Sequence, residues 1–483
     1  MPPRVAVVGG GIAGLSAAHR LRTELGPDAE IVLLEQTTCL GGKLRSVELA
    51  GTAYDLGAEA FLARRPEVLR LAEELGAESE IVHPAGARAT VRAGGRIQHL
   101  PGGTVMGVPA EADSVAGVLS EAGADAVRAE AGLPPIELGG ADASVGGLLR
   151  ERVGDEVVDR LVEPLLGGVY AGDANRLGLR ATIPALAAAL DAGAGSIAEA
   201  VRSALPAPPA RNTTPKPVFG AFRGGYRELI DRLLLAADAD VRLGLPVRGL
   251  ARTGAGWRLE IGAAPAPEHL EADAVVLAIP APAARRLLAD PVPAASERLG
   301  AVELASMAVV GLALPPDTPL PEHDGAAASG TLIARGERRA DGTPFTAKAF
   351  TYSSNKWQHL RGADGEVLVR GSVGRFGETA ELQRDDDELL HRVRADLADL
   401  TGITAEPVES VVLRWGGGLP QYGVGHLDLV ADIERAVAEV HGLAIAGAAL
   451  HGVGVPACVA TGESAATDVT RDLLQTGRLE VGR

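Results

Sequence analysis

Residues 5–18 read VAVVGGGIAGLSAA, and this stretch decides the fold. Its four leading apolar residues predict a short buried strand, and Gly9, Gly11 and Gly14 follow in the G-x-G-x-x-G spacing that opens a helix. The first glycine allows a tight turn, the second lets the backbone approach a pyrophosphate, and the third allows close helix packing. Because the helix N-terminus faces the anion, the stretch predicts a dinucleotide site in a Rossmann-like α/β domain.

An acidic residue completes this nucleotide pattern. Glu35 ends a second predicted strand, residues 30–35, and follows Gly14 by 21 residues. A carboxylate at this place is positioned to accept hydrogen bonds from a ribose 2′-hydroxyl. The order of strand, helix, second strand and acidic residue therefore predicts a bound nucleotide.

A second glycine-rich approach lies near the other end of the chain. Residues 443–456 read LAIAGAALHGVGVP, and a helix is predicted after them over residues 460–474. The amides before such a helix would stabilise the flavin N1–O2 edge, which becomes anionic on reduction. Two glycine-rich segments so far apart in the sequence suit a long cofactor that is bound at both of its own ends, and this favours FAD over NAD.

Two further segments favour FAD. Residues 40–45, LGGKLR, follow Glu35 directly and place Lys43 near a phosphate or ribose. Residues 54–61, YDLGAEAF, offer small side chains against which a flat ring can lie. Each segment alone is also an ordinary turn, so the prediction depends on their order behind the nucleotide motif.

Composition limits the other functions. The 483 residues are 46% hydrophobic, which is enough for two or three compact units. The net charge of −17 opposes binding to a nucleic-acid backbone. No apolar run reaches the length of a membrane-spanning helix.

Cysteine and histidine usage excludes several site types. Cys39 and Cys458 are the only cysteines, so no disulfide framework is implied, and a reducing cytoplasm is expected. A buried, inert thiol is the expected state of Cys458. The ten histidines form no metal-ligand spacing, so no metal site is predicted.

Periodicity outlines the remaining elements. We expect a helix over residues 66–76, a largely helical region over 108–202, and a helix over 385–400. A hairpin-like series is expected from three further segments: residues 247–253, 256–261 and 274–279.

Several blocks in the middle of the chain resemble the protoporphyrinogen/coproporphyrinogen oxidase family. The longest is EPLLGGVYAGDANRLGLRATIP at residues 163–184. The others are LPGGTVMGVP at 100–109, NKWQH at 355–359, LPQYGVGH at 419–426 and GVPACV at 454–459. The resemblance is closest to the bacterial branch that acts on coproporphyrinogen III.

The resemblance implies an α/β (α+β overall) flavoprotein of the amine-oxidase type. A Rossmann-like FAD domain would combine with a substrate domain that contains an antiparallel sheet, and with a helical domain linked to membrane association. The implied boundaries are 1–63, 218–285 and 437–483 for the FAD domain, 64–107 and 286–436 for the substrate domain, 108–205 for the helical domain, and 206–217 for a Pro-rich loop.

The implied reaction is a six-electron oxidation of coproporphyrinogen III to coproporphyrin III, with one non-covalent FAD and with dioxygen reduced to peroxide. Hand-off of the product to a ferrochelatase and at most peripheral membrane contact at the inner face are also implied. Flavin N5 carries the chemistry, so no catalytic side chain is expected.

The resemblance assigns site residues as well. Val247 would offer backbone to the adenine, and Gly454 and Val455 would meet the flavin ring. The full set of expected FAD contacts is Gly9, Gly10, Gly11, Ile12, Ala13, Gly14, Glu35, Gly42, Lys43, Gly57, Ala58, Val247, Gly447, Gly454 and Val455. The expected substrate contacts are Arg65 for a propionate, Val169 in the cavity-lining loop, and the cations Arg64, Lys348 and Lys356.

Three alternatives stay open. Protoporphyrinogen IX is a second possible substrate. An amine oxidase or a carotenoid desaturase would share the FAD frame, although the central blocks argue against both. A flavin- or porphyrin-binding protein without turnover is the third, because this chemistry needs no catalytic dyad that a sequence would reveal.

Overall fold

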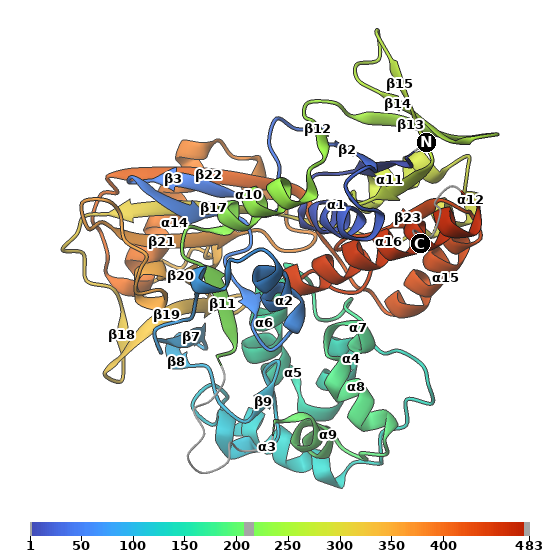
Figure 1. The fold of residues 1–483 in the computed structure, drawn as a ribbon. Helices are drawn as coiled ribbons and strands as arrows, with labels where there is room; N and C mark the ends of the chain where they lie inside the picture. Colours follow the sequence, from blue (N-terminus) through green and yellow to red (C-terminus); the bar gives the residue numbers. More distant parts are fainter. Residues whose placement is uncertain (1, 207–216, 478–483) are drawn as a thin grey trace.

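The computed structural model describes residues 2–206 and 217–477, so the expected Pro-rich loop lies almost entirely outside the described residues. Three regions are visible in Figure 1: a nucleotide-type domain, a broad mostly antiparallel sheet, and a group of short helices below them. The chain passes between these regions several times.

The nucleotide-type domain is built on a five-stranded parallel sheet. Its strands come from the beginning, the middle and the end of the chain, and β1 lies at the centre. All four residues of the run at 5–8 are buried, as a parallel sheet covered on both faces requires. In spatial order the strands are β12 (Asp240–Arg242), β2 (Glu30–Leu34), β1 (Arg4–Val8), β16 (Ala274–Leu277) and β23 (Leu443–Ile445).

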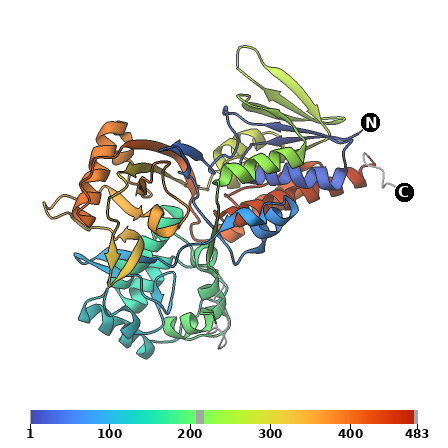
Figure 2. The ribbon, with the colours of Figure 1, turned by 60° about the vertical axis from the view of Figure 1, so that its left-hand side comes forward.

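Four helices share one face of this sheet and lie nearly parallel in Figure 2. They are α1 (Ile12–Leu25), α10 (Tyr226–Ala237), α16 (Val455–Gln475) and α2 (Pro66–Glu74). Two glycines allow their close packing: a Cβ on Gly14 would lie 1.9 Å from the Gly9 carbonyl oxygen, and one on Gly462 would lie 2.1 Å from the Ala13 carbonyl oxygen.

On the opposite face of the sheet, the third strand of the expected hairpin series is not the predicted one. The third antiparallel strand is residues 268–272, whereas residues 274–277 join the parallel sheet instead. The run AVVL is apolar throughout, which suits a strand buried on both sides better than an edge hairpin. This face is covered by β13 (Val247–Thr253), β14 (Gly256–Ile261), β15 (Glu268–Ala272), α11 (Ala281–Leu288), α12 (Pro293–Leu299) and α15 (His426–Ala438).

The second region is an eight-stranded sheet. Every pairing in it is antiparallel except that of β19 with β7. One face packs on α14 (Asp386–Thr401), close to the predicted 385–400. The strands are β22 (Glu409–Pro420), β17 (Leu304–Leu314), β21 (Val367–Val373), β20 (Ala347–Thr351), β19 (Ala326–Ile333), β7 (Arg88–Ala93), β8 (Arg96–His99) and β18 (Glu322–His323).

The third region is helical, as predicted. Its core contains a buried ion pair in which Arg152 Nη2 lies 2.9 Å from Glu130 Oε1. The same carboxylate oxygen accepts a hydrogen bond from the amide of Ile197 at 2.8 Å. The helices are α3 (Glu121–Ala129), α4 (Val145–Val153), α5 (Asp155–Val157), α6 (Glu163–Tyr170), α7 (Leu179–Thr182), α8 (Pro184–Asp191) and α9 (Ile197–Ala204).

Short elements connect the three regions. They are β3 (Ser46–Leu49), β4 (Thr52–Asp55), β5 (Phe61–Leu62), β6 (Ile81–Val82), β9 (Thr104–Val105), β10 (Val108–Pro109), β11 (Phe219–Phe222) and α13 (Ser353–Lys356).

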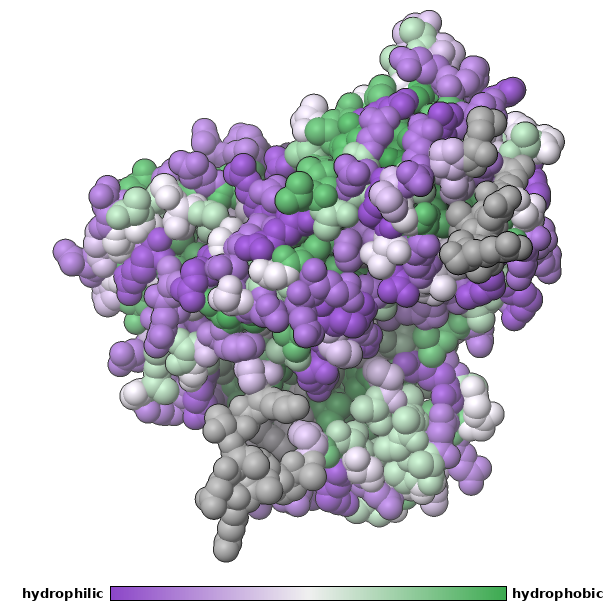
Figure 3. All heavy atoms as spheres, in the orientation of Figure 1, coloured by the Kyte–Doolittle hydropathy of each residue, from purple (hydrophilic) through white to green (hydrophobic). Residues whose placement is uncertain are grey.

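The surface is mostly hydrophilic in the view of Figure 3. Moderately hydrophobic residues gather at the lower right, over the helical region. Within residues 2–206 and 217–477, no helix combines the length and the apolar character needed to span a bilayer.

The close contact between α1 and α16 gives a first prediction. Gly462→Ala would push the two helices apart, because the added Cβ meets a main-chain carbonyl that cannot rotate away. We expect the free energy of unfolding to fall by about 1–3 kcal/mol, the usual cost of overpacking a core. Urea denaturation of the FAD-loaded protein measures this.

Ser464→Ala is the matched control, because Ser464 lies on the exposed face of the same helix. It should change stability by less than about 0.5 kcal/mol. Equal effects of the two substitutions would contradict the packing argument.

Candidate flavin site

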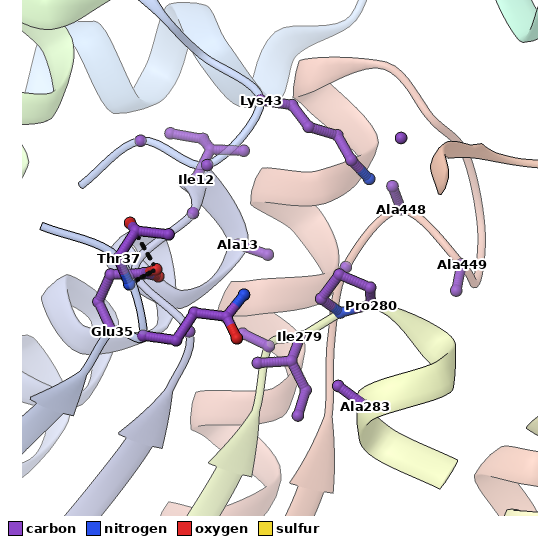
Figure 4. Close-up of a pocket in the computed structure, with 18 of the residues that line it drawn as sticks. Ile12, Ala13, Glu35, Thr37, Lys43, Ile279, Pro280, Ala283, Ala448 and Ala449 are labelled. Atoms are coloured by element: carbon purple, nitrogen blue, oxygen red, sulfur yellow. Dashed lines mark hydrogen bonds between the residues drawn. The ribbon is translucent and has the colours of Figure 1, made fainter. Parts of the chain in front are cut away.

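A cleft of about 800 Å³ lies at the carboxyl ends of the parallel strands. One wall is formed by the loops after β1, β2 and β23 and by the first turns of α1 and α16. The other wall includes Leu413, residues 415–418 and Pro420 of β22, which belongs to the eight-stranded sheet. The cleft therefore lies between two regions, and Figure 4 shows part of it.

Glu35 lies at one end of the cleft and is held by three protein donors. Its Oε2 accepts a hydrogen bond from the Gly10 amide at 2.8 Å. Its Oε1 accepts from both the amide and the hydroxyl of Thr37, each at 2.8 Å. Figure 4 shows Glu35 and Thr37 joined in this way at the cleft wall. The carboxylate is thus fixed in place, with lone pairs left for a further donor.

The middle of the cleft is a cradle made of main chain. The two glycine turns lie side by side, with the Gly41 amide donating to the Gly10 carbonyl oxygen at 2.8 Å, and a Cβ added to Gly11 would meet nothing closer than Gly42 Cα at 4.0 Å. Helix α1 starts here without a side-chain cap and without an acidic residue in its first turn. Its free N–H groups and its dipole favour an anion such as a pyrophosphate at this place.

The far end of the cleft combines a cation with a second uncapped helix. In Figure 4 the Lys43 side chain extends toward Ala448. Burial lowers the pKa of Lys43. Gly454 precedes α16, whose N-terminus also has no side-chain cap and no acidic residue in its first turn. A group that gains negative charge on reduction would be stabilised here.

Cys458 borders the same end of the cleft, but its thiol is buried. Burial raises the pKa of its thiol to about 11, so the nucleophilic thiolate is scarce near neutral pH. The expected burial of Cys458 is confirmed.

Together these features fit FAD. An acceptor suits a ribose, an uncapped helix suits the pyrophosphate, and a second uncapped helix with a lysine suits the reducible ring. The two helix N-termini open into one cleft although they lie at opposite ends of the sequence.

The structure puts most of the predicted FAD contacts on the cleft wall. Four predicted glycines do not line it. Gly10 donates to Glu35, Gly14 packs on Gly9, Gly454 precedes α16, and a Cβ on Gly57 would lie 1.9 Å from the Lys43 carbonyl oxygen. The predicted residues that do line the cleft are Gly9, Gly11, Ile12, Ala13, Glu35, Gly42, Lys43, Ala58, Val247, Gly447 and Val455.

Sequence reasoning missed other wall residues. The segment 415–418, WGGG, lines the cleft from the eight-stranded sheet, and its three consecutive glycines were the signal that could have revealed it. Ile279, Pro280, Ala281 and Ala283 follow β16 and also line the cleft, whereas the expected hairpin series ended at residue 279. Other missed wall residues include Gln36, Thr37, Ala448 and Ala449.

The predicted substrate residues lie outside this cleft wall. Arg65 forms an ion pair with Glu67, with Nη2 and Oε1 2.5 Å apart. Arg64 is exposed and has neither a hydrogen bond nor an ion pair among the described residues. Val169 is 44% exposed at the end of α6.

Two predicted cations already have partners within the protein. Lys348 is buried, and its Nζ donates to the Gly167 carbonyl oxygen at 3.0 Å, so it is not a cation at a cavity mouth. Lys356 is engaged by Glu59, with Nζ and Oε2 3.0 Å apart. The Gly167 carbonyl on α6 and the Glu59 carboxylate are the partners of these two amines.

The structure brings the sequence blocks at 163–184 and 419–426 together beside the cleft. The amide group of Gln421 donates to the Tyr170 carbonyl oxygen at 2.8 Å. The Tyr422 hydroxyl donates to the Ala448 carbonyl oxygen at 2.7 Å, and its ring stacks on His426. The block at 419–426 therefore joins helix α6 to the cleft-lining loop after β23.

Comparison with known proteins identifies the family. A family model described as flavin containing amine oxidoreductase matches residues 12–470. The chain belongs to this family. This flavoprotein is 44% identical to a Mycobacterium leprae protein named coproporphyrinogen III oxidase, over 94% of this chain and 95% of the relative. It is 30% identical to a Bacillus subtilis protein of the same name, over 96% and 97% of the two chains.

Solved structures agree on the fold of this flavoprotein. An Exiguobacterium protein described as a candidate protoporphyrinogen oxidase superimposes with a TM-score of 0.83 at 30% identity, covering 98% of this chain and 99% of the other. Cyclohexylamine oxidase from Brevibacterium oxydans has a TM-score of 0.70 at 15% identity, covering 98% and 100%, and shows a shared fold alone. The α/β amine-oxidase-type fold and the FAD cofactor expected from the sequence are confirmed.

The Glu35 geometry predicts weaker FAD binding in a near-isosteric variant. Glu35→Gln replaces one acceptor oxygen with an NH₂ group that faces the Gly10 or Thr37 donors. We expect the Kd for FAD to rise at least tenfold, or about 1.4 kcal/mol. Recovery of flavin fluorescence on dilution of the loaded protein measures the release.

Glu30→Gln is the control on the same strand, because Glu30 pairs with Arg4 at the surface. Its Kd should match that of the parent. Unchanged binding in Glu35→Gln would show that the carboxylate does not support the cofactor.

Lys348 predicts a pH dependence of stability. Burial lowers the pKa of its amine from 10.5 to about 7. Between these pH values the unfolded chain holds a proton that the folded chain lacks, so folded stability rises as pH increases from 7 to about 10. Below pH 7 the full cost of burying the ammonium is present.

Lys348→Met removes this cost. At pH 6 the variant should be more stable than the parent by on the order of 3 kcal/mol, and the difference should vanish near pH 10. Urea denaturation of both proteins across this range checks it. A difference that does not change with pH would contradict the assignment.

Proposed function

We propose that this flavoprotein oxidises coproporphyrinogen III to coproporphyrin III. The observation that carries the proposal is its 44% identity, over nearly the full length, to a protein named coproporphyrinogen III oxidase. Relatives of that name from Mycobacterium tuberculosis and Staphylococcus aureus also align over 98% of the chain. The FAD-type cleft supports an oxidation that needs no catalytic side chain.

FAD supplies the two-electron acceptor when bound. Six electrons and six protons leave one porphyrinogen in three rounds, and three molecules of dioxygen would take them up to give three of hydrogen peroxide. Main-chain donors at α1 and α16 and the Lys43 amine would hold the cofactor. The wall from β22 would exclude water and orient the substrate side.

Substrate recognition is proposed to involve carboxylate groups. Coproporphyrinogen III bears four propionates, whereas protoporphyrinogen IX bears two. Arg64 is the cation we propose for a propionate, because its guanidinium is exposed and has no partner among the described residues. Arg65, next to Arg64 in the sequence, and Val169, on α6, are proposed to border the substrate.

A cytoplasmic location, with at most peripheral contact at the inner face of the membrane, is part of the proposal. The two free cysteines and the net charge of −17 support it. Passage of the porphyrin product to a ferrochelatase is proposed from the chemistry, because a metal-free porphyrin needs a metal-inserting partner.

Anaerobic mixing tests the function. The flavin absorbance of the loaded protein should bleach with coproporphyrinogen III and recover when air enters, while porphyrin fluorescence appears. Benzylamine should leave the flavin oxidised. Bleaching by benzylamine and not by either porphyrinogen would overturn the proposal in favour of an amine oxidase.

Substrate choice is measured in the same assay. We expect kcat/KM to be higher for coproporphyrinogen III than for protoporphyrinogen IX, and Arg64→Ala should raise KM for the former about tenfold, the usual scale for a lost charged contact. A higher value for protoporphyrinogen IX would reassign the substrate and leave the reaction class intact.

A further inference from the structure

Three metal-ligating side chains meet at the edge of the eight-stranded sheet, away from the FAD cleft. His99 ends β8, His323 ends β18, and Asp324 lies in the turn that joins β18 to β19. Their ligand atoms all lie within 4.8 Å of one another. We propose that His99, His323 and Asp324 bind one divalent transition-metal ion, with Zn²⁺ as the first choice.

The hydrogen bonding of His99 leaves one ring nitrogen, Nδ1, with a free lone pair for a metal ion. Its Nε2 lies 3.1 Å from the His323 carbonyl oxygen, which can only accept, so Nε2 carries the proton. Its Nδ1 is buried and has no hydrogen-bond partner among the described residues. Metal-binding histidines typically donate their other ring nitrogen to a carbonyl or a carboxylate, as His99 does. A buried lone pair without a partner is unfavourable, and a metal ion would satisfy it.

The turn holds the other two ligands side by side. Asp324 has a φ of +50° and Gly325 a φ of +73°, the pattern of a two-residue type I′ hairpin. His323 Nε2 lies 3.5 Å from Asp324 Oδ2, and the His99 and His323 rings meet edge to face with centroids 4.8 Å apart. Ile97 and Leu320 pack on one hydrophobic core and fix β8 beside this turn.

The site is open to an ion from solvent, and small movements of the exposed side chains would complete the coordination. The side chains of His323 and Asp324 are 27% and 78% exposed. Tetrahedral Zn²⁺ with ligands at about 2.0–2.1 Å sets its donor atoms about 3.3 Å apart, so small rotations of the exposed side chains suffice. A fourth position would be left to water.

The donor set selects the class of metal. Two imidazoles and one carboxylate suit Zn²⁺, Ni²⁺, Cu²⁺ or Co²⁺, whereas Mg²⁺ and Ca²⁺ prefer oxygen ligands alone. His99 and His323 are far apart in sequence, so the site could not be predicted from a short metal-ligand spacing.

Titration of the FAD-loaded, chelator-treated protein tests the proposal. Isothermal calorimetry with Zn²⁺ should give one site per chain, and Co²⁺ should give the visible absorption bands of a nitrogen- and oxygen-bound ion. Saturating Zn²⁺ should also raise the melting temperature, because it binds the folded chain. Absence of binding would overturn the proposal.

Matched variants locate the ion. Asp324→Asn should weaken Zn²⁺ binding at least tenfold without disturbing the fold, because Asn also tolerates a positive φ. His99→Gln should do the same, whereas His269→Gln, an exposed histidine on β15, should bind like the parent. Parent-like affinity in both Asp324→Asn and His99→Gln would overturn the proposal, and FAD content checks that each variant is folded.

Discussion

The close approach of α1 to β1 and to α16 is the constraint on which the cleft depends. Gly14 lets α1 lie directly over the Gly9 turn, and Gly462 lets α16 lie against Ala13. A side chain at Gly14 would meet the Gly9 carbonyl oxygen in the turn after β1, and one at Gly462 would meet the Ala13 carbonyl oxygen within α1. Because both contacts are made near the start of α1, the N-termini of α1 and α16 open into one cleft.

This arrangement explains how an acidic protein provides a site for an anionic cofactor. The net charge is −17, yet two uncapped helix N-termini and Lys43 face the cleft. Glu35 is held by Gly10 and Thr37, so the acidic group there serves as a fixed acceptor. Main-chain donors that are already oriented cost little reorganisation when a charge develops.

The other two regions reach the cleft through few contacts. Gln421 and Tyr422 join α6 to the loop after β23, and the WGGG segment brings the eight-stranded sheet to the cleft wall. This packing buries the Lys348 amine, which has the Gly167 carbonyl oxygen of α6 as its hydrogen-bond acceptor. Burial disfavours the charged ammonium and so lowers the pKa of Lys348. The histidine site proposed at the sheet edge lies apart from these contacts.

The sequence by itself determined the nucleotide fold, the FAD cofactor and the family, because these depend on local patterns: G-x-G-x-x-G between a strand and a helix, an acid after the next strand, and long ordered blocks. The helix that follows the glycine turn was predicted and is α1, since a glycine turn between a strand and an apolar periodic stretch is a local signal. Only the tertiary structure decided that residues 274–277 join the parallel sheet, that Lys348 and Lys356 are occupied, and that His99 meets His323. Pairing, burial and ion pairing between distant segments depend on how the chain packs, and no short window of sequence records them.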